Sequence, residues 1–97
     1  MMLLRERSTQ EGPLVSVCDA DVLGETFEND EVSLTVDAEF YDGEAASVEE
    51  VVAGLSRASV ANLVGHEAVG VAVEHDFVEE ANVLELEDTV HAQYLRL

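Results

Sequence analysis

The sequence predicts an α+β fold that combines a mixed sheet of five or six strands with two main helices and one parallel βαβ unit. Short apolar runs that alternate with polar residues recur along the chain, as is typical of strands. Two other segments place apolar residues at helical spacing. A chain of 97 residues is long enough for one hydrophobic core but not for two. Residues 1–97 are therefore expected to form a single globular domain.

The predicted strands are residues 2–7, 14–18, 31–37, 59–64, 82–87 and 91–97. The clearest strand pattern is "EVSLTVD", where Val32, Leu34 and Val36 alternate with polar residues, as in a sheet with one solvated face. A turn is expected at residues 8–13, which contain a Gly-Pro pair.

Two further connections are expected to lack strands. Asp19 is predicted to cap a short helical turn in "ADVLGETF", which Gly24 would end. Residues 39–46, "EFYDGEAA", are predicted to be a loop with an Asp-Gly turn pair.

The first main helix follows a capping box, in which Ser47 is the N-cap and Glu50 lies three residues later. The helix then carries an apolar stripe at Val48, Val51, Val52 and Leu55. The second main helix is predicted at residues 66–76, with its buried side at Ala68, Val69, Ala72 and Val73. Strand, helix and strand in succession between Val60 and Leu86 predict the parallel βαβ unit.

Charge is the strongest compositional feature. The chain has 22 Asp and Glu residues against four Arg and no Lys, which gives a formal net charge of −18. Such a surface repels itself at low salt, whereas at molar salt the Debye length falls to about 3 Å and screens the repulsion. The acids extend from Glu6 to Asp88. This spread favours halophilic adaptation of the whole surface over a dedicated site for cations or basic partners.

The sequence also limits the compartment. A single cysteine allows no intramolecular disulfide, which fits a reducing interior. No apolar stretch approaches the roughly 20 residues that span a bilayer, and Arg5 and Arg7 end the apolar start of the chain. We therefore expect a cytoplasmic protein in a high-salt cytosol, with no membrane partner.

Cys18 leaves several interpretations open. It fits a small buried core residue, and it also fits a thiol nucleophile with His91 as its base, or a binding or redox-sensing thiol. Asp19 opposes the nucleophile because a neighbouring negative charge raises the pKa of a thiol. His66 and His75 are nine positions apart, which places them on opposite faces of one helix. We therefore expect no dedicated metal site, and no motif indicates a cofactor.

Two groups of residues are binding candidates. Gly65 precedes a predicted helix N-terminus, a geometry that receives anions, although a plain turn glycine explains it as well and Glu67 would repel the ligand. Arg5 and Arg7 share one face of the first strand, and Arg96 lies on the last strand with Tyr94 and His91 nearby. If these strands are neighbours, they form one cationic patch. The alternative is surface pairing with nearby glutamates, which contributes little.

Several segments resemble a small archaeal family known only as a domain of unknown function, numbered 424. They are "VSVCDADVLGETF", "EFYDGE", "SVANLVG", "ANVLEL" and "VHAQ". The patterned positions of the family correspond here to Cys18, Asp19, Gly24, Phe40, Tyr41, Gly43, Asn62, Gly65, His91 and Gln93. This chain differs where His66 and Glu67 follow Gly65 and where "LEDTV" precedes His91. The resemblance implies an archaeal cytosolic protein and no established activity.

The leading hypothesis is a non-enzymatic interaction module, with the RNA and translation machinery as a suggested setting. Its partner, a protein or an RNA, is not identified by the sequence. The candidate binding residues are Arg5, Arg7, Asn62, Gly65, His91, Gln93, Tyr94 and Arg96. The alternative is a small enzyme or thiol-dependent factor that uses Cys18 and His91.

Overall fold

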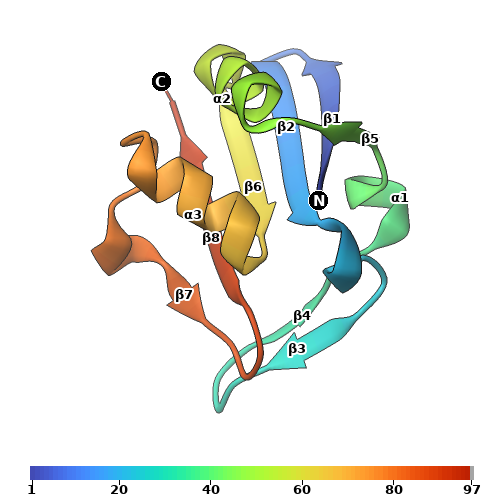
Figure 1. The fold of residues 1–97 in the computed structure, drawn as a ribbon, viewed down its shortest axis with the longest axis vertical. Helices are drawn as coiled ribbons and strands as arrows, with labels where there is room; N and C mark the ends of the chain where they lie inside the picture. The colour runs from blue at the N-terminus through green and yellow to red at the C-terminus, as the bar shows by residue number, and fades with distance from the viewer. Residues whose placement is uncertain (97) are drawn as a thin grey trace.

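The computed structural model describes residues 1–96. Its sheet strands are β1 (Met2–Thr9), β2 (Gly12–Asp19), β5 (Glu44–Ala46), β6 (Val60–Val64), β7 (Leu84–Glu85) and β8 (Val90–Leu95), and a separate hairpin contains β3 (Thr26–Glu28) and β4 (Ser33–Thr35). The helices are α1 (Ala38–Tyr41), α2 (Val48–Arg57) and α3 (His66–Glu74), with 3-10 turns η1 (Ala20–Val22) and η2 (Glu80–Asn82). The six-stranded sheet has the order β5-β1-β2-β6-β8-β7 (Figure 1). This mixed sheet with two main helices confirms the predicted α+β class.

The parallel pair of the sheet is β2 and β6. Between them the chain runs through η1, the β3–β4 hairpin, α1, β5 and α2, and α2 carries it over the sheet into β6, as a crossover between parallel strands requires. The prediction of one parallel βαβ unit is confirmed, but its placement around α3 is wrong. The strand after α3 is β7, which pairs antiparallel with β8 at the edge of the sheet and not with β6.

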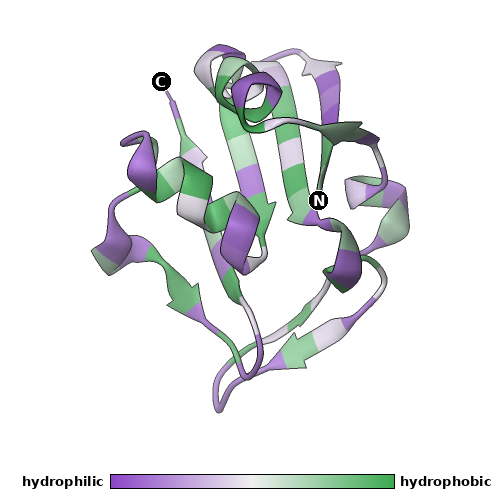
Figure 2. Ribbon diagram, viewed as in Figure 1, coloured by the Kyte–Doolittle hydropathy of each residue, from purple (hydrophilic) through white to green (hydrophobic). Residues whose placement is uncertain are grey.

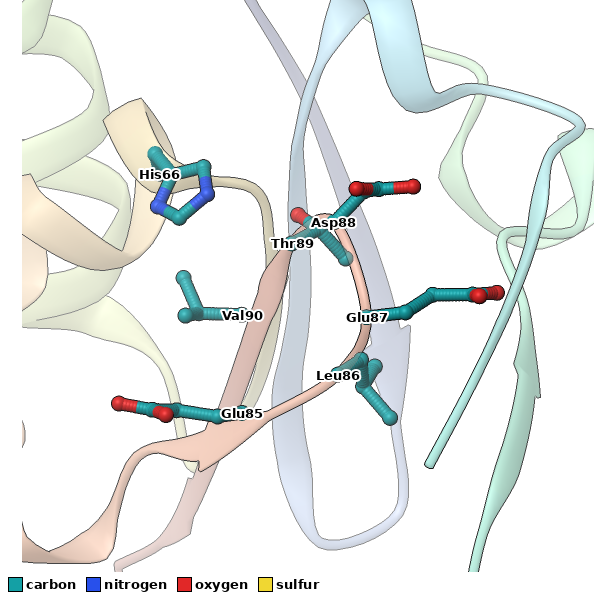
Figure 3. A pocket seen from close by; sticks show the side chains of 7 residues that line it. All are labelled: His66, Glu85, Leu86, Glu87, Asp88, Thr89 and Val90. Atoms are coloured by element: carbon teal, nitrogen blue, oxygen red, sulfur yellow. The ribbon is translucent and has the colours of Figure 1, made fainter. Parts of the chain in front are cut away.

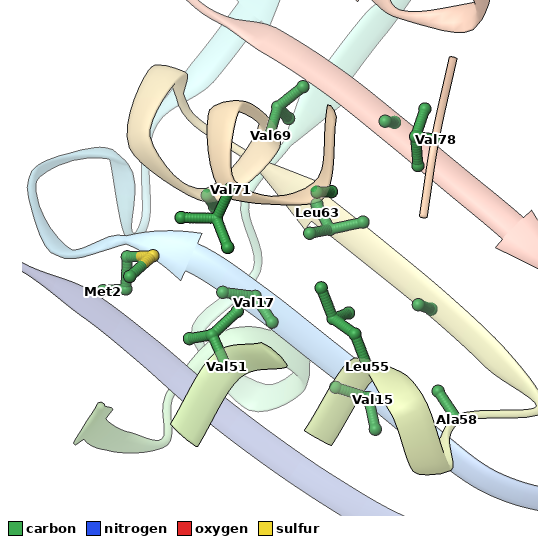
Figure 4. Packing of buried hydrophobic residues seen from close by; sticks show 14 residues of the cluster. Met2, Val15, Val17, Val51, Leu55, Ala58, Leu63, Val69, Val71 and Val78 are labelled. Atoms are coloured by element: carbon green, nitrogen blue, oxygen red, sulfur yellow. The ribbon is translucent and has the colours of Figure 1, made fainter. Parts of the chain in front are cut away.

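Both main helices cover one face of the sheet (Figure 1). The core beneath them is aliphatic, with Val15, Val17, Leu55 and Leu63 fully buried (Figure 4). Figure 2 shows apolar residues concentrated along β2 and β6, the central strands under the helices. The predicted capping box of α2 is present, because Ser47 Oγ accepts from the Glu50 N–H and the Glu50 carboxylate accepts from the Ser47 N–H.

A second apolar cluster lies on the opposite face of the sheet, at one end. The β3–β4 hairpin, η1 and α1 supply Phe27, Val36 and Tyr41, which pack against Cys18 and Val64 of the sheet. This cluster covers only part of that face.

Several boundaries differ from the prediction. The strand predicted at 31–37 is reduced to the three residues of β4, because its partner is the equally short β3 and not the main sheet. The predicted loop 39–46 contains α1 and β5; Asp37 caps α1 by accepting from the Glu39 N–H. β7 is shorter than predicted, and the turn between β1 and β2 is tighter, since both strands extend into residues 8–13. Within residues 1–96, no helix has the length and apolar character to cross a membrane.

Candidate functional site: the uncovered sheet face

Strand register aligns polar side chains across four strands on the face opposite α2 and α3. Arg5 of β1 lies opposite Ser16 of β2, and Ser16 lies opposite Asn62 of β6. Asn62 in turn lies opposite Gln93 of β8. Residues paired across strands point to the same face of a sheet. The alternate positions of these strands contribute to the core under the helices, so this polar row points away from them.

A second row lies beside the first, towards the open end of the sheet. It contains Arg7, Leu14, Val60 and Leu95 in register. Leu95 is 66% exposed, so this row presents a large apolar side chain to solvent. We call the two rows together the uncovered sheet face: Arg5, Arg7, Leu14, Ser16, Val60, Asn62, Gln93 and Leu95. A hollow of about 360 Å³ lies at its β6–β8 side.

The uncovered sheet face contains no Asp or Glu at any of its strand positions. Carboxylates are common elsewhere on the strands and helices of this chain, whose formal net charge is −18. The face therefore differs chemically from the rest of the protein surface. It offers two amides and apolar side chains, whereas Ser16 in its centre is buried.

Arg5 and Arg7 hold α1 against the sheet. Both guanidinium groups donate to the backbone carbonyl of Glu39, Arg5 at 2.7 Å, and Arg5 also donates to the Asp42 carbonyl. Arg7 additionally lies over the Phe40 ring, with Cζ 5.2 Å from its centroid. Carbonyls near the end of a helix lack intrahelical partners and favour cationic donors. The two arginines thus form the rim of the face, and their guanidinium groups already hydrogen-bond the backbone of α1.

The predicted cationic patch of three arginines does not form. β1 and β8 are separated by β2 and β6, so Arg96 lies far across the sheet from Arg5 and Arg7. Arg96 donates to the Ser56 carbonyl of α2 and lies over the Tyr94 ring. The Tyr94 hydroxyl donates to the Leu55 carbonyl at 2.6 Å, and burial raises its pKa. Tyr94 and Arg96 therefore belong to the helix side, apart from Asn62 and Gln93.

Cys18 and His91 do not form a catalytic pair. Cys18 has no exposed surface, and burial, followed by the charge of Asp19, raises the pKa of its thiol to about 11. Val64 lies between the two residues in register, which places their Cα atoms about 10 Å apart across three strands. His91 Nδ1 hydrogen-bonds the Leu63 carbonyl at 2.9 Å. A protonated, enclosed thiol without an adjacent base lacks the features of a nucleophile.

The predicted anion position at Gly65 is filled from within the chain. The carboxylate of Asp19, at the end of β2, accepts from the backbone N–H groups of Glu67 and Ala68 at 3.0 and 2.8 Å. It thus satisfies the free donors at the start of α3. Asp19 was expected to cap the turn that follows it, but its side chain makes no cap bond to η1. It caps a distant helix.

An acidic hollow lies beside the turn between β7 and β8 (Figure 3). Figure 3 shows the side chains of Glu87 and Asp88 pointing away from His66 and Glu85, so the charged groups do not converge. The buried Thr89 Oγ1 has no hydrogen-bond partner within residues 1–96. In that part of the chain, no three His, Cys, Asp or Glu side chains gather as a metal site.

Leu14, Ser16, Val60 and Leu95 were not among the binding candidates of the sequence. Strand alternation alone places each of them on one face of its own strand. The strand order, which brings those faces together across β1, β2, β6 and β8, depends on the crossover through α2. The exposure of Leu95 could not be predicted from the sequence either, because an apolar residue in a predicted strand indicates burial.

The fold and this face define a small α+β protein with a mixed sheet, helices on one side and a partly uncovered second side. The chain belongs to the family described as "Protein of unknown function (DUF424)", whose model matches residues 6–97. It is similar to a crystal structure of an uncharacterized conserved protein from Methanopyrus kandleri, with a TM-score of 0.78 and 21% sequence identity. That similarity covers 99% of this chain and 93% of the other, and it shows the shared fold. No curated protein matches the chain.

Proposed function

We propose that this protein is a non-enzymatic interaction module that docks another protein on its uncovered sheet face. The observation that carries the proposal is the absence of carboxylates from eight aligned strand positions in a chain with a net charge of −18. Residues at the centre of protein interfaces are depleted in charge, and a polar rim surrounds them. The amides of Asn62 and Gln93 beside the exposed Leu95 provide that combination.

A protein partner fits this face better than RNA does. Sheets that bind single-stranded RNA stack bases on aromatic side chains, and none of the eight residues of the face is aromatic. Binding to nucleic acid also depends on phosphate contacts from Lys and Arg. Arg5 and Arg7 already bind the Glu39 carbonyl. Binding of an RNA partner is thus the alternative result that the experiment must distinguish.

We further propose that the module works in the salt-rich cytosol of an archaeon. Its excess of 18 negative charges and its lack of lysine support this setting. At molar salt the Debye length is about 3 Å, so a partner must be held mainly by apolar contacts and hydrogen bonds. The chemistry of the uncovered sheet face meets that requirement.

Affinity purification at molar salt tests the proposal with matched baits. The test bait carries Gln93→Glu and Leu95→Glu, which place two carboxylates on exposed positions of the face. The control bait carries Val48→Glu and Ala53→Glu, which add the same charge to exposed positions of α2. We expect a protein that wild type and control retain, and that the test bait loses by about tenfold or more.

Treatment with ribonuclease separates the two partner classes. A protein partner survives the treatment, whereas a partner held through RNA is released. Equal retention by the test and control baits, or loss of all specific proteins after ribonuclease, contradicts the proposed function. Circular dichroism of each bait confirms that both variants are folded.

A further inference from the structure

A separate groove lies on the helix side of the sheet, lined by residues of α3, β7 and the segments beside β7. Its volume is about 370 Å³, at the lower end of the range of about 300–1,000 Å³ for ligand sites. It therefore admits a few side chains and not a whole helix. The groove is on the opposite side of the sheet from Asn62 and Gln93, so the inference does not rest on the proposed function.

The floor of the groove is apolar. Val69 and Val73 of α3 face Val83 and Val90 across it. Of these, Val73, Val83 and Val90 are only partly buried although they pack against the main core. The structure thus leaves apolar surface accessible at one place beside the core.

Gly70 keeps this groove open. It lies inside α3, where glycine is less favourable than alanine because of its backbone entropy. A β-carbon on Gly70 would meet no atom within 4 Å, so packing does not require glycine there. Any larger residue at this position would project into the space that Gly70 lines.

Three carboxylates surround the apolar floor: Glu74 at the end of α3, Glu80 in η2 and Glu85 in β7. His66, at the start of α3, also lines the groove, and the lining contains no arginine. An apolar floor with three carboxylates at its rim is complementary to a segment that carries an apolar side chain beside basic ones.

A second copy of this chain would be a poor occupant. The chain has no lysine, and each of its four arginines already hydrogen-bonds within its own chain. Arg5 and Arg7 bind the Glu39 carbonyl, Arg57 binds Glu6, and Arg96 binds the Ser56 carbonyl. The complementary charge must come from a different polypeptide.

We propose that the α3–β7 groove binds a short segment of a partner protein, in which an apolar anchor side chain enters the groove and flanking Lys or Arg side chains contact Glu74, Glu80 and Glu85. The apolar contact persists at high salt, whereas the charge contacts weaken as salt screens them.

Titration with three sets of short synthetic peptides tests this proposal. All carry a Leu, Phe or Met anchor, flanked by Lys and Arg in the first set, by Ser and Gln in the second and by Glu in the third. Amide chemical shifts of the folded protein locate binding at two salt concentrations. We expect the basic peptides to shift Val69, Gly70, Val73 and Val83 and to bind about tenfold tighter than the neutral set at the lower salt. The acidic set should not bind.

Two variants distinguish binding in the groove from nonspecific attraction of basic peptides to the acidic surface. Gly70→Leu fills the groove and should weaken binding of the basic peptides about tenfold or more. Ala53→Leu, which adds a leucine on the exposed side of α2, should leave peptide binding unchanged. Glu80→Gln with Glu85→Gln should remove most of the difference between basic and neutral peptides. The matched control is Glu44→Gln with Glu49→Gln.

Three results overturn the proposal. In the first, no peptide of the basic set shifts the groove amides. In the second, shifts spread evenly over the acidic surface. In the third, a folded Gly70→Leu protein binds as well as wild type.

Discussion

Asp19 and Gly65 are in direct contact at the start of α3, where a β-carbon on residue 65 would lie 2.2 Å from Cγ of Asp19. Gly65 has a φ of +117°, a backbone conformation that residues with side chains rarely adopt. The end of β2 thereby reaches the free N–H groups of α3. This pair joins the parallel strands to the second helix.

Gly65→Ala should therefore be strongly destabilising. Both the positive φ and the collision with the Asp19 carboxylate oppose a β-carbon, and together they should cost about 3 kcal/mol or more of unfolding free energy. Urea unfolding at molar salt measures the loss.

Gly70→Ala, inside α3, is the matched control. It should stabilise the fold by up to about 1 kcal/mol, because a β-carbon there meets open space and alanine favours the helix. In an Asp19→Ala background, Gly65→Ala should cost less than in wild type, because the collision is gone while the backbone strain remains. An additive double mutant would contradict the contact.

The Asp19–Gly65 pair also shows where sequence reasoning ends. Local patterns predicted α2 correctly, since its capping box and apolar stripe lie within ten residues of each other. The role of Asp19 depends on residues 48 and 49 positions away, which no local pattern contains. For the same reason the placement of the parallel pair was wrong, although its existence was predicted.

The uncovered sheet face was predictable only in part. Arg5, Arg7, Asn62 and Gln93 were named as candidates and do share one side of the sheet. Their grouping with Tyr94 and Arg96 failed because these two residues alternate with Gln93 and Leu95 along the chain and bind α2 on the helix side, and because two strands separate Arg96 from Arg5 and Arg7. Strand order is a property of the whole chain, so residue patterns within single strands do not determine it.

Cys18 should make the fold sensitive to alkaline pH. Burial raises the pKa of its thiol from an ordinary value of 9.0 to about 11, so the folded state holds this proton more tightly than the unfolded state. Its contribution to stability is complete below pH 9 and is lost as the pH rises through about 11. The unfolding free energy should fall over that window.

Cys18→Ala should reduce the fall in unfolding free energy at alkaline pH. Tyr41→Phe should remove a further part of that fall at higher pH, because burial raises the pKa of Tyr41 to about 12. Native Cys18 should also resist an aromatic disulfide reagent at pH 8 and react on unfolding. Rapid labelling of the folded protein would show that the thiol is accessible.

Arg7→Gln should loosen α1 without unfolding the sheet. The substitution removes the bond to the Glu39 carbonyl and the contact with the Phe40 ring, and it should cost about 1 kcal/mol. Hydrogen exchange should accelerate at the amides of Tyr41 and Asp42, which bond within α1. Arg96→Gln, on the other side of the sheet, should leave the exchange of these amides unchanged. An equal effect of both variants would contradict the role of Arg7 in holding α1 on the sheet.

Salt should stabilise the fold. With 22 acidic side chains against four arginines, repulsion acts over a Debye length of about 10 Å at 0.1 M salt and about 3 Å at 1 M. The fold should loosen below about 0.5 M salt through this loss of screening, and the Tm should rise towards molar salt. KCl and NaCl should act alike; the same Tm at low and molar salt would contradict the halophilic interpretation.

The most direct test of the proposed function is site-specific photo-crosslinking at Leu95 in cells of a salt-rich host. A photoreactive phenylalanine derivative replaces Leu95 in one strain and Val48, an exposed apolar residue of α2, in another. The account predicts a discrete protein adduct from position 95 that resists ribonuclease, and no such adduct from position 48. Equal adducts from both positions, or an adduct to RNA, would contradict it.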